Sequence, residues 1–373
     1  MDLLQSIEAQ KEEIIKVYQD LHAIPERGME EVQTSAYIKE KLEAAGFEVV
    51  KVGDTTGLIA TLKGTEPGPV YAVRADMDAL VFTVDGKDIN HHACGHDANS
   101  TMALMGALAI AKKGIKKGTL KVVFQPAEET LVGALSVLES GLLADIDEMV
   151  GIHLRPIQEA KMGQATAALC HGSAYVIDAT ITGLNAHGAR PHLGINAIDA
   201  GASVVNAVNA IKMNPVVPYS VKTTKFVAGG SASNIIPDKT TMVFGLRAQT
   251  NEVMEELIEK TKRAIVQGAA TVGATAEVSV RGGVPAAAHD DEVVARTKEA
   301  IVTALGEALD PIVTIGGEDF HFFSTKGGIK TAYIGLGADL VPGLHSLDMS
   351  FNLDALVNGV KIIATAIDQR LNG

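Results

Sequence analysis

The stretch His91-His92-Ala93-Cys94-Gly95-His96-Asp97 runs directly into a segment with a helix-like pattern. Cys94 and His96 are two residues apart, so in an extended loop their side chains would leave the backbone on the same side and converge on one point. Gly95 lets the backbone approach closely, and Asp97 stands where a helix N-cap or first-turn acid would stand. A thiolate beside an imidazole suits a borderline transition metal such as zinc, manganese, nickel or cobalt. The stretch therefore predicts two ligands of a metal site.

The composition of the chain bounds its class. A chain of 373 residues with 47% hydrophobic residues is expected to form two globular domains. The net charge of −13 argues against binding to nucleic acid or to an anionic membrane surface. No apolar run approaches the roughly 20 residues that cross a bilayer, and the first residues show no signal-peptide core. The two cysteines, Cys94 and Cys170, cannot form a disulfide framework, so we expect a cytoplasmic protein.

The first part of the chain alternates between helical and extended patterns. Apolar residues recur at a helical period from the start to a point before Pro25. Further helices are predicted over residues 30–45, 101–112 and 130–143, and strands over residues 47–52, 57–62, 70–75, 120–124 and 148–153. This alternation indicates an α/β layer, whose functional side chains are expected at the carboxyl ends of the strands.

The pattern changes near residue 174. Strands are predicted over residues 174–181, 220–227, 240–247 and 274–280, and helices over residues 196–211 and 252–268. This β-α-β-β-α-β order is the ferredoxin-like arrangement. The chain then returns to a helix over residues 290–305, a strand near Tyr333 and a final helix over residues 354–371. We therefore predict an α/β fold with a discontinuous domain over residues 1–173 and 287–373 and an inserted ferredoxin-like domain over residues 174–286.

Two adjacent glutamates follow a predicted strand in Gln125-Pro126-Ala127-Glu128-Glu129. Adjacent residues of an extended segment face opposite ways, so one carboxylate can bind a metal while its neighbour turns toward a substrate. A glutamate pair taken alone is more often a solvated turn. Its place after a buried strand and downstream of Cys94 and His96 makes it the best candidate for a general base.

Two single histidines stand in comparable positions. His153 ends a predicted strand in Gly151-Ile152-His153-Leu154-Arg155-Pro156, and His345 lies in the loop Gly343-Leu344-His345-Ser346. A lone histidine of this kind is more often a structural residue than a ligand. Neither histidine is informative in isolation, and the pattern of all the segments must decide.

Together with Gly316-Gly317-Glu318-Asp319-Phe320, these segments resemble the aminoacylase/carboxypeptidase family of co-catalytic metallopeptidases. They are most similar to its amidohydrolase branch, peptidase family M20, subfamily D. The resemblance extends from Leu21-His22-Ala23-Ile24-Pro25-Glu26 to the final helix. It implies a phosphorylase/hydrolase-like α/β/α catalytic domain, with the insert acting as a lid and dimerisation domain of a homodimer.

The resemblance also implies roles for single residues. It makes Glu128 the catalytic base and implies two divalent metal ions per subunit (Zn, Mn, Ni or Co). The metal ligands that it implies are Cys94, His96, Glu129, His153 and His345. The ions would lie roughly 3.5–4 Å apart, with Cys94 or a water bridging them. For Cys94 alone, the alternative is an inert buried thiol.

The predicted lid contributes a second set of candidates. They are His187 in residues 185–191, Asn234 in residues 229–237, and Arg247. In related enzymes the matching histidine stabilises the developing oxyanion, and the matching asparagine and arginine hold the substrate carboxylate, a task suited to a planar guanidinium. The alternative for Arg247 is that it is an exposed arginine without a functional role. The other histidines are interpreted as structural or solvated, namely His22, His171, His192, His289 and His321.

The chain departs from the family pattern in three places. The family usually carries Met at the position of His91 and His at the position of Asn99. The segment over residues 80–91 looks shorter than usual and lacks the common proline after Leu80. Because this segment borders the predicted site, the departures affect substrate preference more than the chemistry.

These observations favour metal-dependent hydrolysis of an amide bond next to a free carboxylate, in N-acyl amino acids or small peptides. Glu128 would move the proton from water to the leaving amine, and His187 would bind the oxyanion. Two alternatives stay open: a cysteine hydrolase that uses Cys94 with His96 as base, and a catalytically silent homologue that only binds substrate. The choice of metal, the acyl group, the oligomeric state, and whether His187 serves its own subunit or a neighbour's are left open as well.

Overall fold

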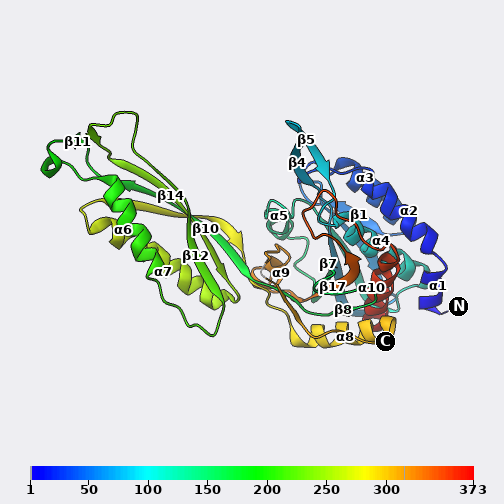
Figure 1. Ribbon diagram of the computed structural model, residues 1–373. Helices are drawn as coiled ribbons and strands as arrows, with labels where there is room; N and C mark the ends of the chain where they lie inside the picture. Colours follow the sequence, from blue (N-terminus) through cyan, green and yellow to red (C-terminus); the bar gives the residue numbers. More distant parts are fainter. Residues whose placement is uncertain (1, 315) are drawn as a thin grey trace. The chain divides into compact units, whose positions relative to one another are not determined.

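The computed structural model describes residues 2–314 and 316–373. The chain separates into two compact units, each with its own hydrophobic core (Figure 1). Unit 1 is made of Met1–Cys170, Ala288–Val313 and Asp319–Gly373. Unit 2 is made of His171–Ala287 and the short segment Thr314–Glu318. The sequence of unit 2 therefore interrupts that of unit 1.

Unit 1 is built on a seven-stranded mixed sheet with the order β1-β2-β6-β3-β7-β17-β8. The strands are β1 (Glu48–Lys51), β2 (Leu58–Lys63), β3 (Glu66–Asp76), β6 (Lys117–Gln125), β7 (Glu148–Pro156), β8 (Ala165–Thr166) and β17 (Lys330–Leu340). The four strands β6, β3, β7 and β17 are parallel to their neighbours within this set. Eight of the nine residues of β7 are buried, as expected for a strand covered on both faces.

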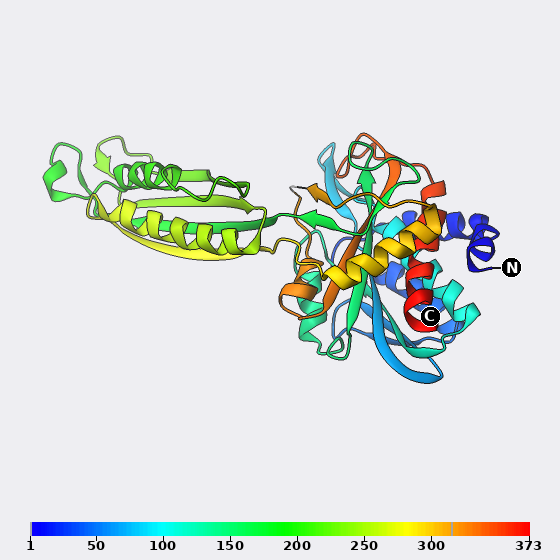
Figure 2. The same ribbon diagram turned by 90° about the horizontal axis from the view of Figure 1, so that it is seen from below.

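Helices cover both faces of this sheet. They are α1 (Leu3–Glu8), α2 (Lys11–His22), α3 (Val32–Ala44), α4 (His96–Lys113), α5 (Gly133–Glu139), α8 (Asp291–Leu305), α9 (His321–Thr325) and α10 (Asp354–Asn372). Figure 1 shows α4 and α10 on one face of the sheet and the short helices α5 and α9 on the other, and Figure 2 shows α8 running beside α10. Helix α4 is buried nearly all round, which explains its apolar composition. Among the described residues, no helix has the length and apolar character that a membrane span requires.

Unit 2 is a four-stranded antiparallel sheet with two helices packed on one face. The strands are β10 (Ser173–Thr182), β12 (Tyr219–Ala228), β14 (Lys239–Ala248) and β15 (Thr275–Val284), and the helices are α6 (Ala197–Asn209) and α7 (Asn251–Ala270). The strand order β12-β14-β10-β15 is that of the ferredoxin-like fold. Alternate residues of β14, including Phe244 and Leu246, point into the core with Leu257 and Ile265 of α7. The predicted α/β class with a ferredoxin-like insert is confirmed.

Several elements differ from the sequence prediction. Residues 80–91, to which the sequence analysis assigned no strand, form a hairpin of β4 (Leu80–Val84) and β5 (Lys87–His91). Asp85 and Gly86 both have positive φ, which fits a two-residue turn between strands. The helix predicted over residues 130–143 is confined to α5. The remaining short elements are β9 (Leu169–His171), β11 (Ala186–His187), β13 (Ile235–Ile236), β16 (Ile312–Thr314) and the 3-10 helix Pro191–Leu193.

Candidate active site

The predicted ligands of unit 1 lie along one edge of its sheet. Strand β3 ends at Asp76, which pairs with Gln125 at the end of β6, so the segments that follow both strands start side by side. His153 lies in β7 and pairs with Gly335 of β17. His345 lies in the loop that follows β17. This is the carboxyl edge of the parallel strands, where functional groups gather in α/β sheets.

Cys94 and His96 converge by a route that the sequence analysis did not foresee. The extended loop predicted between them is wrong, because Gly95 has a φ of 83° in the left-handed region and His96 is the first residue of α4. The turn at Gly95 therefore replaces the pleat as the cause of convergence. Asp97 lies in the first turn of α4 as expected, and its Oδ1 accepts from the N–H of Ala98.

Both buried imidazoles are held by one ring nitrogen and offer the other. The Nδ1 of His96 lies 2.9 Å from the carbonyl oxygen of Asp78 and 3.1 Å from its Oδ1. The Nδ1 of His153 donates to the carbonyl of Leu154 at 2.7 Å, and its Nε2 lies 3.5 Å from Sγ of Cys94. This is the orientation that metal-binding histidines adopt. Nε2 of His96 and Oε1 of Glu129 are buried without a hydrogen-bond partner, as expected of atoms that bind a cation.

Glu128 and Glu129 lie in a turn after β6 and not in an extended segment. Their backbone N–H groups donate to the two carboxylate oxygens of Asp78, each at 3.1 Å. One oxygen of each glutamate lies 3.9 Å from Nε2 of His96. The prediction that the two carboxylates face opposite ways is therefore wrong, because the turn directs both toward the same point.

The structure brings the five predicted metal ligands together within unit 1. In each of three groups the ligand atoms lie within 4.8 Å of one another: Cys94, His96 and His153; Cys94, Glu129 and His345; and His96, Glu128 and Glu129. The first two groups share Cys94, and together they could hold two divalent cations. His345 is the most accessible member, with 56% of its side chain exposed, and its Nε2 lies 3.5 Å from Oε1 of Glu129.

The buried groups of the site create a negative potential. Burial works against the ionisation of Asp76, but His96 and Arg74 outweigh it and lower the pKa of Asp76 to about 2. Burial also works against protonation of His96, yet Asp76 and Cys94 raise its pKa well above the ordinary value. Burial lowers the pKa of His153 to about 3 and raises that of the Cys94 thiol. A potential that holds a proton on His96 would equally attract a cation to its Nε2.

A buried network of charged and polar side chains supports the sheet edge that carries the proposed ligands. Arg74 donates to Asp76 at 2.6 Å, to Gln125 at 2.8 Å and to Asp319 at 3.0 Å. Asn99, one of the departures from the family pattern, donates to the other oxygen of Asp76 at 2.9 Å. The sequence analysis assigned no role to Arg74 or Asp319. For Arg74 the signal was the cluster of charged residues at the end of a strand, in Arg74-Ala75-Asp76-Met77-Asp78.

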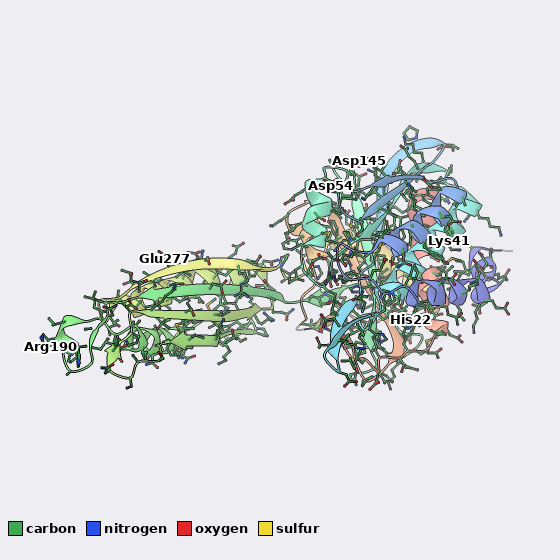
Figure 3. The ribbon with its side chains drawn as sticks, turned by 90° about the horizontal axis from the view of Figure 1, so that it is seen from above. His22, Lys41, Asp54, Asp145, Arg190 and Glu277 are labelled. Carbon is green, nitrogen blue, oxygen red and sulfur yellow. The ribbon has the colours of Figure 1, made fainter. Side chains whose placement is uncertain are left out.

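His22 also has a specific partner, although the sequence analysis left it as an ordinary histidine. Its Nδ1 lies 2.6 Å from Oδ2 of Asp97, which follows the ligand His96, and this hydrogen bond raises the pKa of His22. Figure 3 labels His22 at the end of α2. His91 and His92 lie beside its ring, with centroids 6.0 and 6.2 Å away.

The candidates of unit 2 do not form one cluster. His187 of β11 pairs with Ile235 of β13, and the N–H of Gly188 donates to the carbonyl of Asn234, so His187 and Asn234 are neighbours. Arg247 pairs with Ala174 at the start of β10.

The other end of β10, at Thr182, pairs with Lys239, eight residues before Arg247. At roughly 3.3 Å per residue, the two ends of this ladder lie about 26 Å apart. Figure 3 shows Arg190, which follows His187 closely, at the end of unit 2 where β11 lies. The register therefore separates Arg247 from the β11 end of unit 2, where His187 and Asn234 lie, and the roles of these three residues stay predictions.

Comparison with known proteins shows the family of the chain. Residues 72–369 match peptidase family M20/M25/M40. The chain belongs to this family.

Relatives of the M20 protein include an N-acetyl-L-cysteine deacetylase of Bacillus subtilis, with 31% identity covering 88% of this chain and 82% of the relative. An IAA-amino acid hydrolase (ILR1-like 2) of Arabidopsis thaliana is 33% identical, covering 96% of this chain and 85% of the relative. Among solved structures, the YXEP protein of Bacillus subtilis, described as a dinuclear metal binding peptidase from the M20 family, has a TM-score of 0.83 and 27% identity over 98% of this chain and 99% of its own. The M20 protein is therefore a hydrolase that acts on carbon–nitrogen bonds.

Proposed function

We propose that this M20 hydrolase cleaves the amide bond of N-acyl amino acids or small peptides with the aid of two divalent cations. The observation that carries the proposal is the pair of ligand groups that share Cys94, with Glu128 beside them. The relatives support the substrate class, because those with assigned names include deacetylases of N-acetylcysteine and a hydrolase of amino acid conjugates.

The proposed ligands are the five side chains predicted from the sequence, and they fit such a centre. One thiolate, three imidazoles and a carboxylate form a mixed donor set that suits zinc, manganese, nickel or cobalt. When bound, the two cations would activate a water and polarise the scissile carbonyl. The carboxylate of Asp78 contacts both the ring of His96 and the backbone N–H of Glu129. These contacts orient the two proposed ligands, so that they need little rearrangement to bind a cation.

Glu128 is the proposed catalytic base. Only 6% of the residue is exposed, and Oε2 faces Nε2 of His96 at the centre of the ligand groups. Its carboxylate would accept the proton of the attacking water and deliver it to the leaving amine nitrogen. Its backbone N–H is bound to Asp78, which limits the positions that the carboxylate can take.

We further propose that unit 2 acts as a lid in a homodimer and that His187 serves the site of a second copy. The ladder in unit 2 separates the end near Arg247 from the end near Lys239 by about 26 Å, which is longer than a small N-acyl amino acid. One lid therefore cannot offer both Arg247 and His187 to the same substrate molecule. The proposal assigns the oxyanion contact to His187 and the substrate carboxylate to Asn234 and Arg247, with His187 and Asn234 from one copy of the chain and Arg247 from the other.

The two alternatives have less support. A cysteine hydrolase would need an ionised Cys94, but burial raises the pKa of its thiol well above the ordinary value. A thiol with a raised pKa forms the reactive thiolate less readily. A catalytically silent homologue would be expected to have lost part of the site, whereas the proposed base and all five proposed ligand residues are present in this chain and lie close together.

The test is a panel of N-acyl amino acids and dipeptides assayed with each of several divalent metals. We expect hydrolysis of at least one N-acyl amino acid that a chelator stops and that added metal restores. Loss of activity to a thiol alkylator in the metal-loaded enzyme, together with resistance to chelators, would favour the cysteine hydrolase. Substrate binding without turnover under every metal would favour the silent homologue.

A further inference from the structure

Glu31 is a buried carboxylate that does not serve the helix it precedes. The residue is 0% exposed and occupies the N-cap position of α3 without a side-chain hydrogen bond to that helix. The first turn of α3 is instead bound by Glu26, whose carboxylate accepts from the N–H groups of Gln33 and Thr34 at 2.9 Å. A buried carboxylate destabilises a fold unless it is well hydrogen-bonded. The stability of α3 therefore does not account for Glu31.

Both carboxylate oxygens of Glu31 are bound by distant segments. Oε1 accepts from the backbone N–H of Ala127 at 2.8 Å, across 96 residues of sequence, and Oε2 accepts from the hydroxyl of Thr56. Burial raises the pKa of Glu31, whereas these hydrogen bonds favour its ionised form. The contact to Ala127 links Glu31 to the turn that carries Glu128 and Glu129.

Ala127 is the residue of this turn that most needs support. Its φ of 52° lies in the left-handed region, which is strained for a residue with a Cβ. Gly28 packs directly against it, since a Cβ at Gly28 would lie 2.9 Å from both Cα and Cβ of Ala127. The segment from Gly28 to Glu31 therefore touches Ala127 twice, once by packing and once by a hydrogen bond.

Three successive N–H groups of the turn are bound by buried carboxylates. Glu31 binds that of Ala127, and Asp78 binds those of Glu128 and Glu129. Because a turn of this length has few internal hydrogen bonds, these contacts define where its two glutamate side chains begin. Asp78 also contacts His96, but the carboxylate of Glu31 is hydrogen-bonded to the turn and to Thr56 and not to a proposed ligand.

We propose that Glu31 is a positioning residue, which holds Ala127 in its left-handed conformation and thereby aims Glu128 and Glu129 at the metal centre. The inference rests on the roles proposed above for these two glutamates. Loss of Glu31 would displace a proposed ligand and the proposed base together, without removing either side chain.

The test compares Glu31→Leu with Glu31→Gln. Leucine fills the site but cannot accept a hydrogen bond, whereas the amide oxygen of glutamine can still accept from Ala127. We expect Glu31→Leu to lower kcat about 10–100-fold with KM within about threefold, in the range found for residues that orient ligands. Calorimetric titration of the metal-free protein with zinc or manganese should show one of two sites weakened by about tenfold or more. Glu31→Gln should restore most of both properties.

The matched control is Glu26→Leu. It removes a carboxylate five residues away that binds only the first turn of α3, so it should lower thermal stability and leave kcat and both metal affinities near those of the parent. Should Glu31→Leu fail to fold, Gly28→Ala presses on Ala127 from the same side and should weaken the same metal site. Parent-like metal binding and kcat in Glu31→Leu, or equal losses in Glu26→Leu, would overturn the proposal.

The metal titration needs no substrate and so separates this inference from the proposed function. If the parent protein binds two metal ions but cleaves nothing in the substrate panel, the proposed function fails while the comparison of Glu31 with Glu26 still gives an answer. If the parent cleaves an N-acyl amino acid and Glu31→Leu binds both ions normally, the proposed function stands and the positioning role is wrong.

Discussion

The predicted catalytic groups are buried and fixed at the sheet edge of unit 1 that carries the proposed metal ligands, whereas they are exposed at the β11 end of unit 2. In unit 1, His96 and His153 are 0% and 3% exposed, and each ring is fixed by a second hydrogen bond. In unit 2, His187 and Asn234 are exposed, and the N–H of Ala189, two residues away, donates to the ring of His187. A cation site needs its ligand side chains fixed before the cation arrives. A contact to a developing oxyanion can instead be completed when the lid closes.

The largest expected effect tests the base in the rigid region. Glu128→Gln keeps the shape of the side chain but cannot take a proton, so kcat should fall about 10³-fold or more. Metal content, measured by elemental analysis, should stay at the parent value because the proposed ligands are untouched. Near-normal turnover in this variant would remove Glu128 from the mechanism.

The second effect tests the exposed region. His187→Ala should lower kcat about 10²–10³-fold, the usual loss for one oxyanion donor, with little change in thermal stability because the side chain is exposed.

Hybrid dimers of His187→Ala with Glu128→Gln subunits then decide which copy His187 serves. If it acts on the neighbour's site, each hybrid contains one intact site and recovers about half of the parent activity per dimer, since the proposed arrangement combines an unaltered base with an unaltered lid. Hybrids as inactive as the dimers of either single variant would mean that His187 acts in the site of its own subunit.

Metal removal should affect the two units differently, because all five proposed ligands belong to unit 1. A metal present at about 100 times its Kd stabilises the folded state by about 2.7 kcal/mol. With roughly 2–4 °C per kcal/mol for a unit of this size, calorimetry should show the unit 1 transition fall by about 5–10 °C in a chelator. The transition of unit 2 should stay in place, and an equal shift of both would mean that the cations also stabilise unit 2.

The contrast between the two regions also explains what the sequence could predict. The five proposed ligands were predicted to meet, and their side chains do lie together in unit 1, because residues at the ends of parallel strands share an edge and the family pattern names them. The local geometry was wrong at Cys94–His96 and at Glu128–Glu129. There, a left-handed glycine and a turn replace the extended backbone that spacing arguments assume.

Contacts between distant segments left almost no local signal. Arg74 with Asp319, and Glu31 with Ala127, are 245 and 96 residues apart, so no periodicity links them. The hairpin β4–β5 was missed although Asp85-Gly86 after the apolar run Leu80–Val84 is a strong turn signal, because the second strand, Lys87–His91, is mostly polar. In unit 2 the ferredoxin-like arrangement was predicted from the order of strands and helices along the chain. The separation of Arg247 from His187 needed the register of β10 with β14.

A smaller effect is expected at the other end of the lid sheet. Arg247 is exposed, and its Nη1 donates to the carbonyl of Leu246, which leaves other N–H groups of the guanidinium to bind a carboxylate. Arg247→Ala should raise KM about tenfold, about 1.4 kcal/mol, with kcat within about threefold, because the contact is made equally in the ground and transition states. Steady-state kinetics on an N-acyl amino acid and on its amide, which lacks the carboxylate, checks the assignment: only the acid should lose affinity.

The smallest effect lies at the margin of the rigid region, where half-exposed His22 meets buried Asp97. The hydrogen bond to Asp97 raises the pKa of His22 above its unfolded value, so the pair stabilises the fold below the unfolded pKa of about 6.5 and loses this contribution as the pH rises through the folded pKa. Because 42% of the His22 side chain is exposed, solvent limits the contribution to at most about 1 kcal/mol. His22→Gln should therefore lower the unfolding temperature of unit 1 by about 2–4 °C at pH 6 and by much less at pH 9. A loss of equal size at both pH values would mean that His22 acts through packing on Tyr18, with which its ring stacks at 5.3 Å, and not through its charge.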